Sequence, residues 1–269
     1  MQRVCAKLSV VRRACMVRHP CSSSSASLLR GLASSSASLL PLPPLGSGAK
    51  RLYLARHGET DWNLQRRIQG RTIDQPLNAN GLAQAAGLAQ LLVGEPLELI
   101  VASPLRRAAR TAQLMHEHHS DAAWRLEPRF EEMCFGQFEG RTLDEFETTY
   151  RSTLDAWSRG DLNVRWPGDG GESCGDVAKR ALAGLRDLGL LDSPGLDAGA
   201  TRHVLVVAHS RVNKSLIAAL RGDLSRCSEV EQGNACLNVI DFVDGRAEVV
   251  LLDHTGDDGS TRVSEKIWN

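Results

Sequence analysis

The chain carries the stretch RLYLARHGET at residues 51–60, and this stretch decides its fold. The first five residues form a short apolar run that stops abruptly at charged residues and a glycine, as a buried parallel strand does. Ligands of open parallel sheets bind beyond the carboxyl ends of the strands. His57 is therefore expected at the ligand edge, beside the fixed positive charge of Arg56, which suits a phosphate. Gly58 lets the backbone turn tightly there.

Similar apolar runs recur along the chain and alternate with helical segments. The further runs cover residues 97–102, 204–208, 237–243 and 247–252, the last two joined at Asp244-Gly245. Helices are expected at residues 81–93, 103–117, 142–157 and 173–188, and after Ser210 through Leu220. Ser103 is the expected N-cap of the second helix, with Pro104 at its first position. The alternation predicts one α/β domain with a mainly parallel sheet flanked by helices on both faces.

Two other predicted strands deliver polar residues to the same edge. His209 and Ser210 follow the run at 204–208, so His209 can face His57 across one crevice; a buried core histidine is the alternative. Arg106, Arg107 and Arg110 follow the run at 97–102 near a helix N-terminus, and both guanidinium groups and helix N-termini favour anions. For Arg106 and Arg110, a solvated helix face is the favoured interpretation.

A carboxylate-bearing loop with glycines and aromatic residues lies at residues 130–140. Cleavage of a phosphoester needs a proton for the leaving oxygen, which a partly buried carboxyl group can supply. Spacing alone does not choose among Glu131, Glu132 and Glu139.

Together these residues resemble the histidine phosphatase superfamily, also called the phosphoglycerate mutase-like family. The matching elements are Arg-His-Gly-Glu-Thr at 56–60, Asn63, Ser-Pro-Leu-x-Arg-Ala at 103–108, Glu-x-x-x-Gly at 132–136, Gly-Glu-Ser at 171–173 and Ala-His-Ser at 208–210. They follow the family's order from about Lys50 to the final strands.

The resemblance implies a role for each matching position. His57 would be the nucleophile that becomes phosphohistidine, and Glu132 the proton donor that later takes a proton from water. The residues that would bind the phosphoryl group are Arg56, Asn63, Gln69, Gly70, Arg107, His209 and Ser210. Fixed cations can stabilise the charge of a transferring phosphoryl group without a metal. No metal or other cofactor is therefore expected.

The reaction itself is expected to be hydrolysis of a small phosphorylated metabolite. Three departures from the mutases support this: no Gly-Trp element follows the first motif, Met133-Cys134-Phe135 stands where mutases have Arg-His-Tyr, and the segment between Glu132 and His209 is short. Phosphoglycerate mutase-type transfer is the first alternative. A catalytically retired protein that binds a phospholigand or a partner is the second.

The first 48 residues differ in composition from the rest of the chain. They are rich in Arg, Ser, Ala and Leu, contain no Asp or Glu, and end in a Pro- and Gly-rich stretch. This predicts an organellar transit peptide and linker at 1–48, mitochondrial or plastid, ahead of a catalytic domain at 49–269. The alternative is a disordered basic tail on a cytoplasmic protein.

Charge and hydropathy exclude other classes of function. Nine of the 32 basic residues precede Glu59, which leaves 23 basic against 32 acidic residues in the remainder. This mildly acidic body gives no reason to propose nucleic-acid binding. No apolar run has the length of a membrane span. The seven cysteines form no C-x-x-C pair, and the histidines of residues 116–119 stand too close together to converge on one ion. The oligomeric state cannot be inferred from the sequence.

Overall fold

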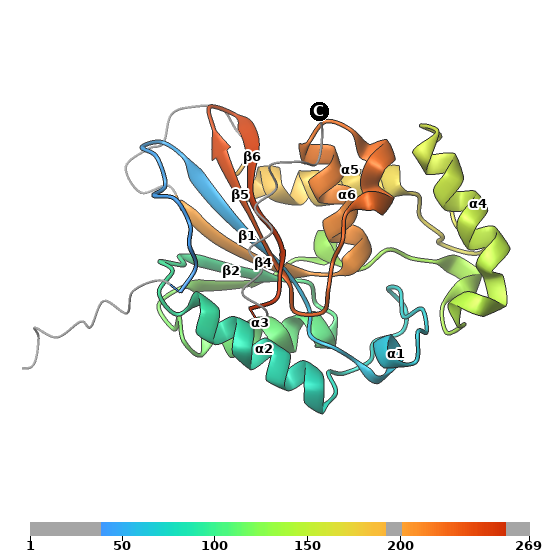
Figure 1. Ribbon diagram of the computed structural model, residues 1–269, viewed down its shortest axis with the longest axis horizontal. Coiled ribbons are helices and arrows are strands. Elements are labelled where there is room, and N and C mark those ends of the chain that lie inside the picture. Colours follow the sequence, from blue (N-terminus) through green and yellow to red (C-terminus); the bar gives the residue numbers. More distant parts are fainter. Residues whose placement is uncertain (1–38, 192–200, 257–269) are drawn as a thin grey trace, which may run out of the picture. The chain divides into compact units, whose positions relative to one another are not determined.

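The computed structural model describes residues 39–191 and 201–256 of the chain (Figure 1). Most of the predicted transit peptide lies outside the described residues, and its targeting role stays a prediction. The described end of this segment packs on the domain: Leu40 is buried in the core, and Arg51 donates a hydrogen bond of 2.9 Å to the carbonyl oxygen of Pro43.

A single six-stranded sheet forms the centre of the α/β domain, with strand order β3-β2-β4-β1-β5-β6. The strands are β1 (Lys50–Arg56), β2 (Leu99–Ala102), β3 (Ala123–Leu126), β4 (His203–Ala208), β5 (Leu237–Val243) and β6 (Arg246–His254). The first four in space, from β3 to β1, pair in parallel, and β5 and β6 add antiparallel pairs at the other edge. The predicted mainly parallel sheet is confirmed.

Helices cover both faces of this sheet, as predicted (Figure 1). The helices α2 (Ala79–Leu92) and α3 (Arg106–His116) pack on the face that carries Tyr53, Ile100 and Leu205. On the opposite face, α5 (Cys174–Asp187) and α6 (Ser210–Leu220) pack against Leu52 and Val206. Because successive side chains of a strand point to opposite faces, a short strand apolar throughout needs both layers.

The predicted start of the helix after β2 is wrong. Ser103 does not cap α3; the helix begins at Arg106, and Leu105 occupies the N-cap position without a side-chain hydrogen bond. The Ser103 hydroxyl instead contacts Nε2 of His209 at 2.8 Å, and the carboxylate of Asp74 accepts the backbone N–H of Arg106 at 2.8 Å. The Ser103 hydroxyl also accepts the backbone N–H of Leu105 at 3.3 Å, but no helical turn begins there.

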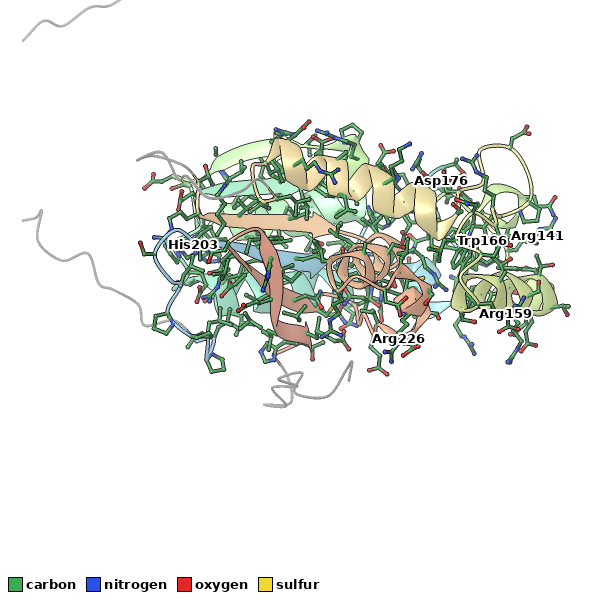
Figure 2. The ribbon with its side chains drawn as sticks, turned by 90° about the horizontal axis from the view of Figure 1, so that it is seen from above. Arg141, Arg159, Trp166, Asp176, His203 and Arg226 are labelled. Atoms are coloured by element: carbon green, nitrogen blue, oxygen red, sulfur yellow. The ribbon has the colours of Figure 1, made fainter. Side chains whose placement is uncertain are left out.

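An aromatic cluster supports the segment that lies beyond the carboxyl ends of the strands. This segment includes α4 (Glu147–Ser158) and the 3₁₀ turn Leu143–Phe146, which together replace the single predicted helix at 142–157. Trp166 packs edge-on against Trp157 and stacks on Tyr150 at 5.7 Å between ring centroids. Figure 2 shows Trp166 beside α4, at the opposite end of the sheet from His203, where β4 begins.

Candidate active site

The ends of three adjacent parallel strands bring the predicted histidines together. β1 and β4 pair with Arg56 opposite Ala208, so His57 and His209 leave the sheet side by side. Their ring centroids lie 5.1 Å apart. The neighbouring strand β2 ends at Ala102, and the hydroxyl of the next residue, Ser103, contacts His209. Parallel register alone therefore places these three side chains at one edge.

His57 is held in one orientation and one tautomer. Its Nδ1 lies 2.7 Å from the carbonyl oxygen of Gly58, and a carbonyl can only accept, so Nδ1 carries the proton and donates it. The lone pair of the ring is then on Nε2. A side chain at position 58 would clash with the backbone of Gly81, because a Cβ there would lie 2.3 Å from its carbonyl oxygen. Gly58 thus permits the close backbone packing that fixes the loop.

Burial keeps both histidines neutral. The pKa of His57 lies well below its ordinary value, first because of burial and then because Arg107 and Arg56 repel a second positive charge. Burial and the neighbouring Arg107 and His57 likewise lower the pKa of His209. A neutral imidazole with a free Nε2 lone pair is the form of histidine that can act as a nucleophile.

Two buried arginines face the same pocket and are fixed by backbone carbonyls. Arg107 is 1% exposed and donates to the carbonyl oxygens of Gly70 (2.7 Å) and Ile73 (3.2 Å). Arg56 donates to the carbonyl oxygen of Gln232 at 2.7 Å. These neutral acceptors orient both guanidinium groups, and Arg107 also pairs with the carboxylate of Asp74 at 3.7 Å. Burial lowers the pKa of Arg107 to about 10, so it is still charged at neutral pH.

Several buried nitrogen atoms around the pocket have no hydrogen-bond partner among the described residues. They are Nε of Arg56, Nε of Arg107 and Nδ1 of His209. Buried polar atoms are nearly always satisfied, so a group of unsatisfied ones at one site needs an explanation. The first turn of α6 begins at the same place, and the N-terminus of a helix attracts negative charge. The arrangement is suited to an anion with several acceptor oxygens.

Of the three candidate carboxylates, the structure brings Glu132 into the pocket. Glu132 is 8% exposed, and its two oxygens accept the backbone N–H groups of Met133 (2.8 Å) and Arg211 (3.3 Å). Glu139 instead accepts the backbone N–H groups of Arg71 and Phe135 and holds the loop together. Glu131 pairs with Arg71 at 3.4 Å, outside the pocket.

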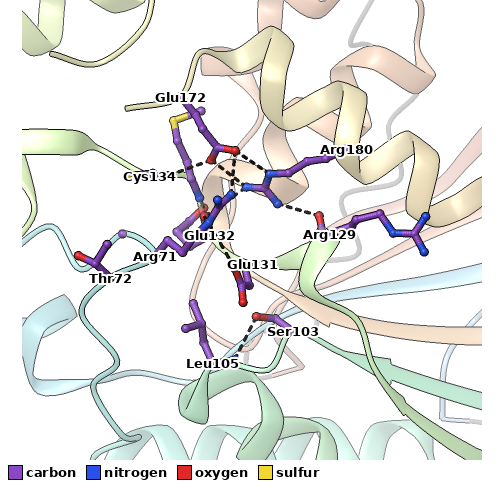
Figure 3. A network of polar contacts seen from close by, with 12 residues as sticks. Arg71, Thr72, Ser103, Leu105, Arg129, Glu131, Glu132, Cys134, Glu172 and Arg180 are labelled. Atoms are coloured by element: carbon purple, nitrogen blue, oxygen red, sulfur yellow. Dashed lines mark hydrogen bonds and ion pairs between the residues drawn. The ribbon is translucent and has the colours of Figure 1, made fainter. Parts of the chain in front are cut away.

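A charged network holds the peptide that carries Glu132 (Figure 3). Its carbonyl oxygen accepts from Arg71 (3.3 Å) and Arg180 (3.2 Å). Both arginines also pair with the carboxylate of Glu172, at 2.8 and 2.9 Å, and this carboxylate accepts the backbone N–H of Cys134. Burial opposes ionisation of Glu172, yet Arg180 and the other donors lower its pKa below the ordinary value. The predicted Gly-Glu-Ser element therefore positions the acidic loop.

The pocket has a volume of about 300 Å³ and collects most of the predicted site residues. Its lining includes Arg56, His57, Asn63, Gln69, Gly70, Arg107, Glu132 and Ser210. His209 is fully buried beside His57. Oδ1 of Asn63 accepts from the backbone of Thr60 and from Asn234, which leaves its amide nitrogen as a donor.

Sequence reasoning missed part of the pocket wall. Phe135, Tyr150, Arg211 and Lys214 line it, as do Arg66 and Arg67. Arg71, from the same loop, pairs with Glu172 instead. The spacing of Arg211 and Lys214 after His209, within the first turns of a helix, is the signal that could have found them.

Further polar side chains lie outside the pocket. Within residues 39–191 and 201–256, no group of three His, Cys, Asp or Glu side chains could hold a metal ion. His116 contacts the carbonyl oxygen of Ala122, and His118 is exposed at the helix end. Four cysteines are buried and free: Cys134, Cys174, Cys227 and Cys236. No described helix is both long enough and apolar enough to cross a membrane.

The buried histidines predict an acid-sensitive fold. The folded-state pKa of His57 and of His209 lies below 6.5, so below pH 6.5 these imidazoles bind protons in the unfolded chain but stay neutral in the folded protein. The free energy of unfolding should then decrease with falling pH, by up to about 1.4 kcal/mol per pH unit for each histidine. Urea unfolding at pH 7, 6 and 5 measures this slope. The free energy of unfolding of His57→Gln should depend less steeply on pH than that of wild type. Equal slopes would contradict a lowered pKa of His57 in the folded protein.

The comparisons with known proteins agree with this geometry. Residues 52–255 match the histidine phosphatase superfamily (branch 1), and the chain belongs to this family. The protein is a phosphatase of that superfamily. The phosphatase PhoE of Bacillus subtilis, itself uncharacterised, is 31% identical over 191 residues, which cover 71% of this chain and 88% of that one. The glucosyl-3-phosphoglycerate phosphatase of Mycolicibacterium vanbaalenii is 35% identical over 173 residues, 64% of this chain and 75% of that one.

A solved structure with a bound phosphomonoester has the same fold. It is a mutant phosphoserine phosphatase from Entamoeba histolytica in complex with phosphoserine. It superposes with a TM-score of 0.64 at 28% identity, and the match covers 76% of this chain and 97% of that one.

Proposed function

We propose that the protein is a metal-independent phosphomonoesterase that hydrolyses a small phosphorylated metabolite through a phosphohistidine intermediate on His57. One observation carries the proposal: a neutral His57 with its lone pair on Nε2 shares a single pocket with two buried arginines and the carboxyl group of Glu132. This combination holds a nucleophile, a proton donor and an anion cradle together.

In the first step, Nε2 of His57 attacks phosphorus in line with the leaving oxygen. The bond from phosphorus to that oxygen breaks, Glu132 gives the oxygen its proton, and the alcohol departs. Arg56, Arg107 and the unpaired Nδ1 side of His209 bind the equatorial oxygens, where the negative charge is spread in the transition state. Asn63, Gln69, Gly70 and Ser210 complete the wall around them.

In the second step, water attacks the phosphohistidine and Glu132 takes its proton. The bond from phosphorus to nitrogen breaks, inorganic phosphate forms, and His57 recovers its neutral ring. Division of one difficult displacement into two is the general advantage of a covalent intermediate. The proton that Glu132 lost in the first step is restored in the second, so the cycle balances.

A small substrate fits the dimensions of the pocket. Its volume of about 300 Å³ is at the lower end of the range for small-molecule sites. The substrates that appear in the names of the relatives, glucosyl-3-phosphoglycerate and phosphoserine, are likewise small phosphate esters.

A panel of phosphorylated compounds tests the proposed function. Full-length protein is incubated with sugar phosphates, phosphoglycerates, nucleotides and phosphopeptides, with and without EDTA, and released phosphate is measured. We expect hydrolysis of a subset of the small metabolites, with rates that differ by less than about twofold in the presence of EDTA. Loss of all hydrolysis on chelation would contradict metal independence.

Two other results would favour a different function. Interconversion of phosphoglycerates that depends on bisphosphoglycerate, without release of phosphate, would favour the mutase. Tight binding of phosphorylated ligands by a folded protein that neither hydrolyses nor transfers would favour the retired binding protein.

A further inference from the structure

The pocket contains more positive charge than one phosphate group requires. Six cationic side chains and a single carboxylate, Glu132, line it. A phosphate monoester carries about two negative charges at neutral pH. Arg56 and Arg107 lie beside the two histidines, where the proposed function places the phosphoryl group. The other four cations are Arg66, Arg67, Arg211 and Lys214.

Lys214 is one of these four additional cations. It stands on α6 one turn beyond Ser210, half-buried, with its side chain in the pocket wall. It makes no hydrogen bond or ion pair with the described residues, and burial, Arg211 and Arg56 lower its pKa to about 8. A half-buried cation without a counterion is costly. An anion of the ligand would supply the missing partner.

Arg211 is held next to it by an aromatic side chain. Its Nη2 donates to the hydroxyl of Tyr150, and its guanidinium carbon lies 5.3 Å from the centroid of that ring. Neither contact neutralises the charge. Its backbone N–H meanwhile binds Glu132, so one residue joins the proton donor to the cationic wall.

The loop at the mouth holds Arg66 in a strained conformation. Its φ angle is +55°, a left-handed backbone that non-glycine residues rarely adopt. Hydrogen bonds of its own N–H to Asn63 (3.0 Å) and of Leu143 to its carbonyl oxygen (3.4 Å) keep it there. Strain of this kind persists where the surroundings impose it, and it is common at ligand sites.

We propose that Lys214 and Arg211, with Arg66 at the mouth, form a subsite for a second anionic group of the substrate, a carboxylate or a second phosphate. This rests on the proposed function, which places the scissile phosphate at His57, Arg56 and Arg107. The substrate is then an anionic phosphate ester, and the second group anchors it with its leaving oxygen toward Glu132.

The test compares substrate pairs that differ in this second group. The carboxylate pair is 3-phosphoglycerate and glycerol 3-phosphate; the phosphate pair is fructose 1,6-bisphosphate and fructose 6-phosphate. For each pair, the ratio of the two kcat/KM values measures discrimination. In at least one pair, wild type should have the higher kcat/KM for the more anionic member. Lys214→Met should reduce the kcat/KM ratio of that pair about 30-fold, which is the effect of losing one charge-assisted hydrogen bond. The responding pair identifies the second group.

Controls separate this subsite from the phosphate site and from folding. Lys179→Met removes an exposed lysine of α5 and should leave both ratios unchanged. Arg66→Met, an exposed position at the mouth, should reduce the same ratio by a smaller factor. Hydrolysis of an aryl phosphate, which has no second anion, reports on the proposed function independently.

Each outcome decides the subsite proposal. If aryl phosphate is hydrolysed but wild type discriminates in neither pair, or Lys214→Met lowers both members equally, the subsite is wrong and the proposed function stands. If nothing is hydrolysed, the proposed function fails. Calorimetric binding of the same four compounds to wild type and Lys214→Met then tests the subsite, by the ratio of the two Kd values within each pair.

Discussion

Replacement of His57 by alanine is expected to lower kcat by about 10⁴-fold or more for every substrate of the enzyme. Nε2 of His57 is the proposed attacking atom, because Nδ1 of this ring donates to Gly58 and the lone pair is on Nε2; Nε2 of His209 is engaged by Ser103. The remaining arginines and Glu132 would still bind substrate. Steady-state kinetics with an aryl phosphate and with the best metabolite of the panel measure the effect.

The matched control for this variant is His118→Ala. His118 is an exposed histidine at the end of α3, far from the chemistry, and its replacement should leave kcat within about twofold of wild type. Circular dichroism and a thermal melt establish that both variants are folded. A folded His57→Ala protein with activity near that of wild type would remove His57 as the nucleophile.

Replacement of Glu132 by glutamine is expected to slow cleavage according to the leaving group. An alkyl phosphate needs a proton on its departing oxygen, so kcat should fall by about 10³-fold, within the range for general acid catalysis. A nitrophenyl leaving group is stable as an anion, so its release should suffer far less, by about tenfold. Glutamine preserves the shape of the side chain, and rates for a series of esters with graded leaving-group pKa measure the slope.

Glu131→Gln is the control, because it alters the adjacent carboxylate outside the pocket. It should change neither the absolute rates nor the dependence on the leaving group by more than a few-fold. Equal slowing of good and poor leaving groups by Glu132→Gln would contradict the assignment of Glu132 as the acid, and would point to a role in holding Arg211 instead.

The elements of the fold that could be predicted are those marked by a local sequence pattern, such as a short apolar run. Short apolar runs located β1, β2, β4 and the hairpin of β5 and β6, whose turn at Asp244-Gly245 has a left-handed backbone. β3 was not predicted, because its sequence, Ala123–Leu126, mixes one charge with exposed apolar residues at a sheet edge. The predicted start of α3 was wrong because the helix begins at Arg106, whose backbone N–H is bound by Asp74, a residue far away in sequence.

In the site, too, positions next to strands could be predicted from the sequence, and contacts between distant segments could not. Residues that directly follow strands were placed correctly, since parallel pairing alone brings His57, Arg56 and His209 to one edge. The support of Glu132 could not be derived, because Arg71, Glu172 and Arg180 meet from three separate segments. Tyr150 enters the pocket from α4, through aromatic packing that no periodicity reveals.

The central claim is a covalent phosphohistidine on His57, and one measurement addresses it directly. The protein is mixed with ³²P-labelled substrate, quenched in alkali within the first turnover, digested and analysed by mass spectrometry. We expect phosphate on the peptide that contains residues 51–60, stable in alkali, lost in acid, and formed fast enough to be an intermediate. Rapid turnover with no phosphorylated peptide, or with the label on a serine or on another histidine, would contradict it.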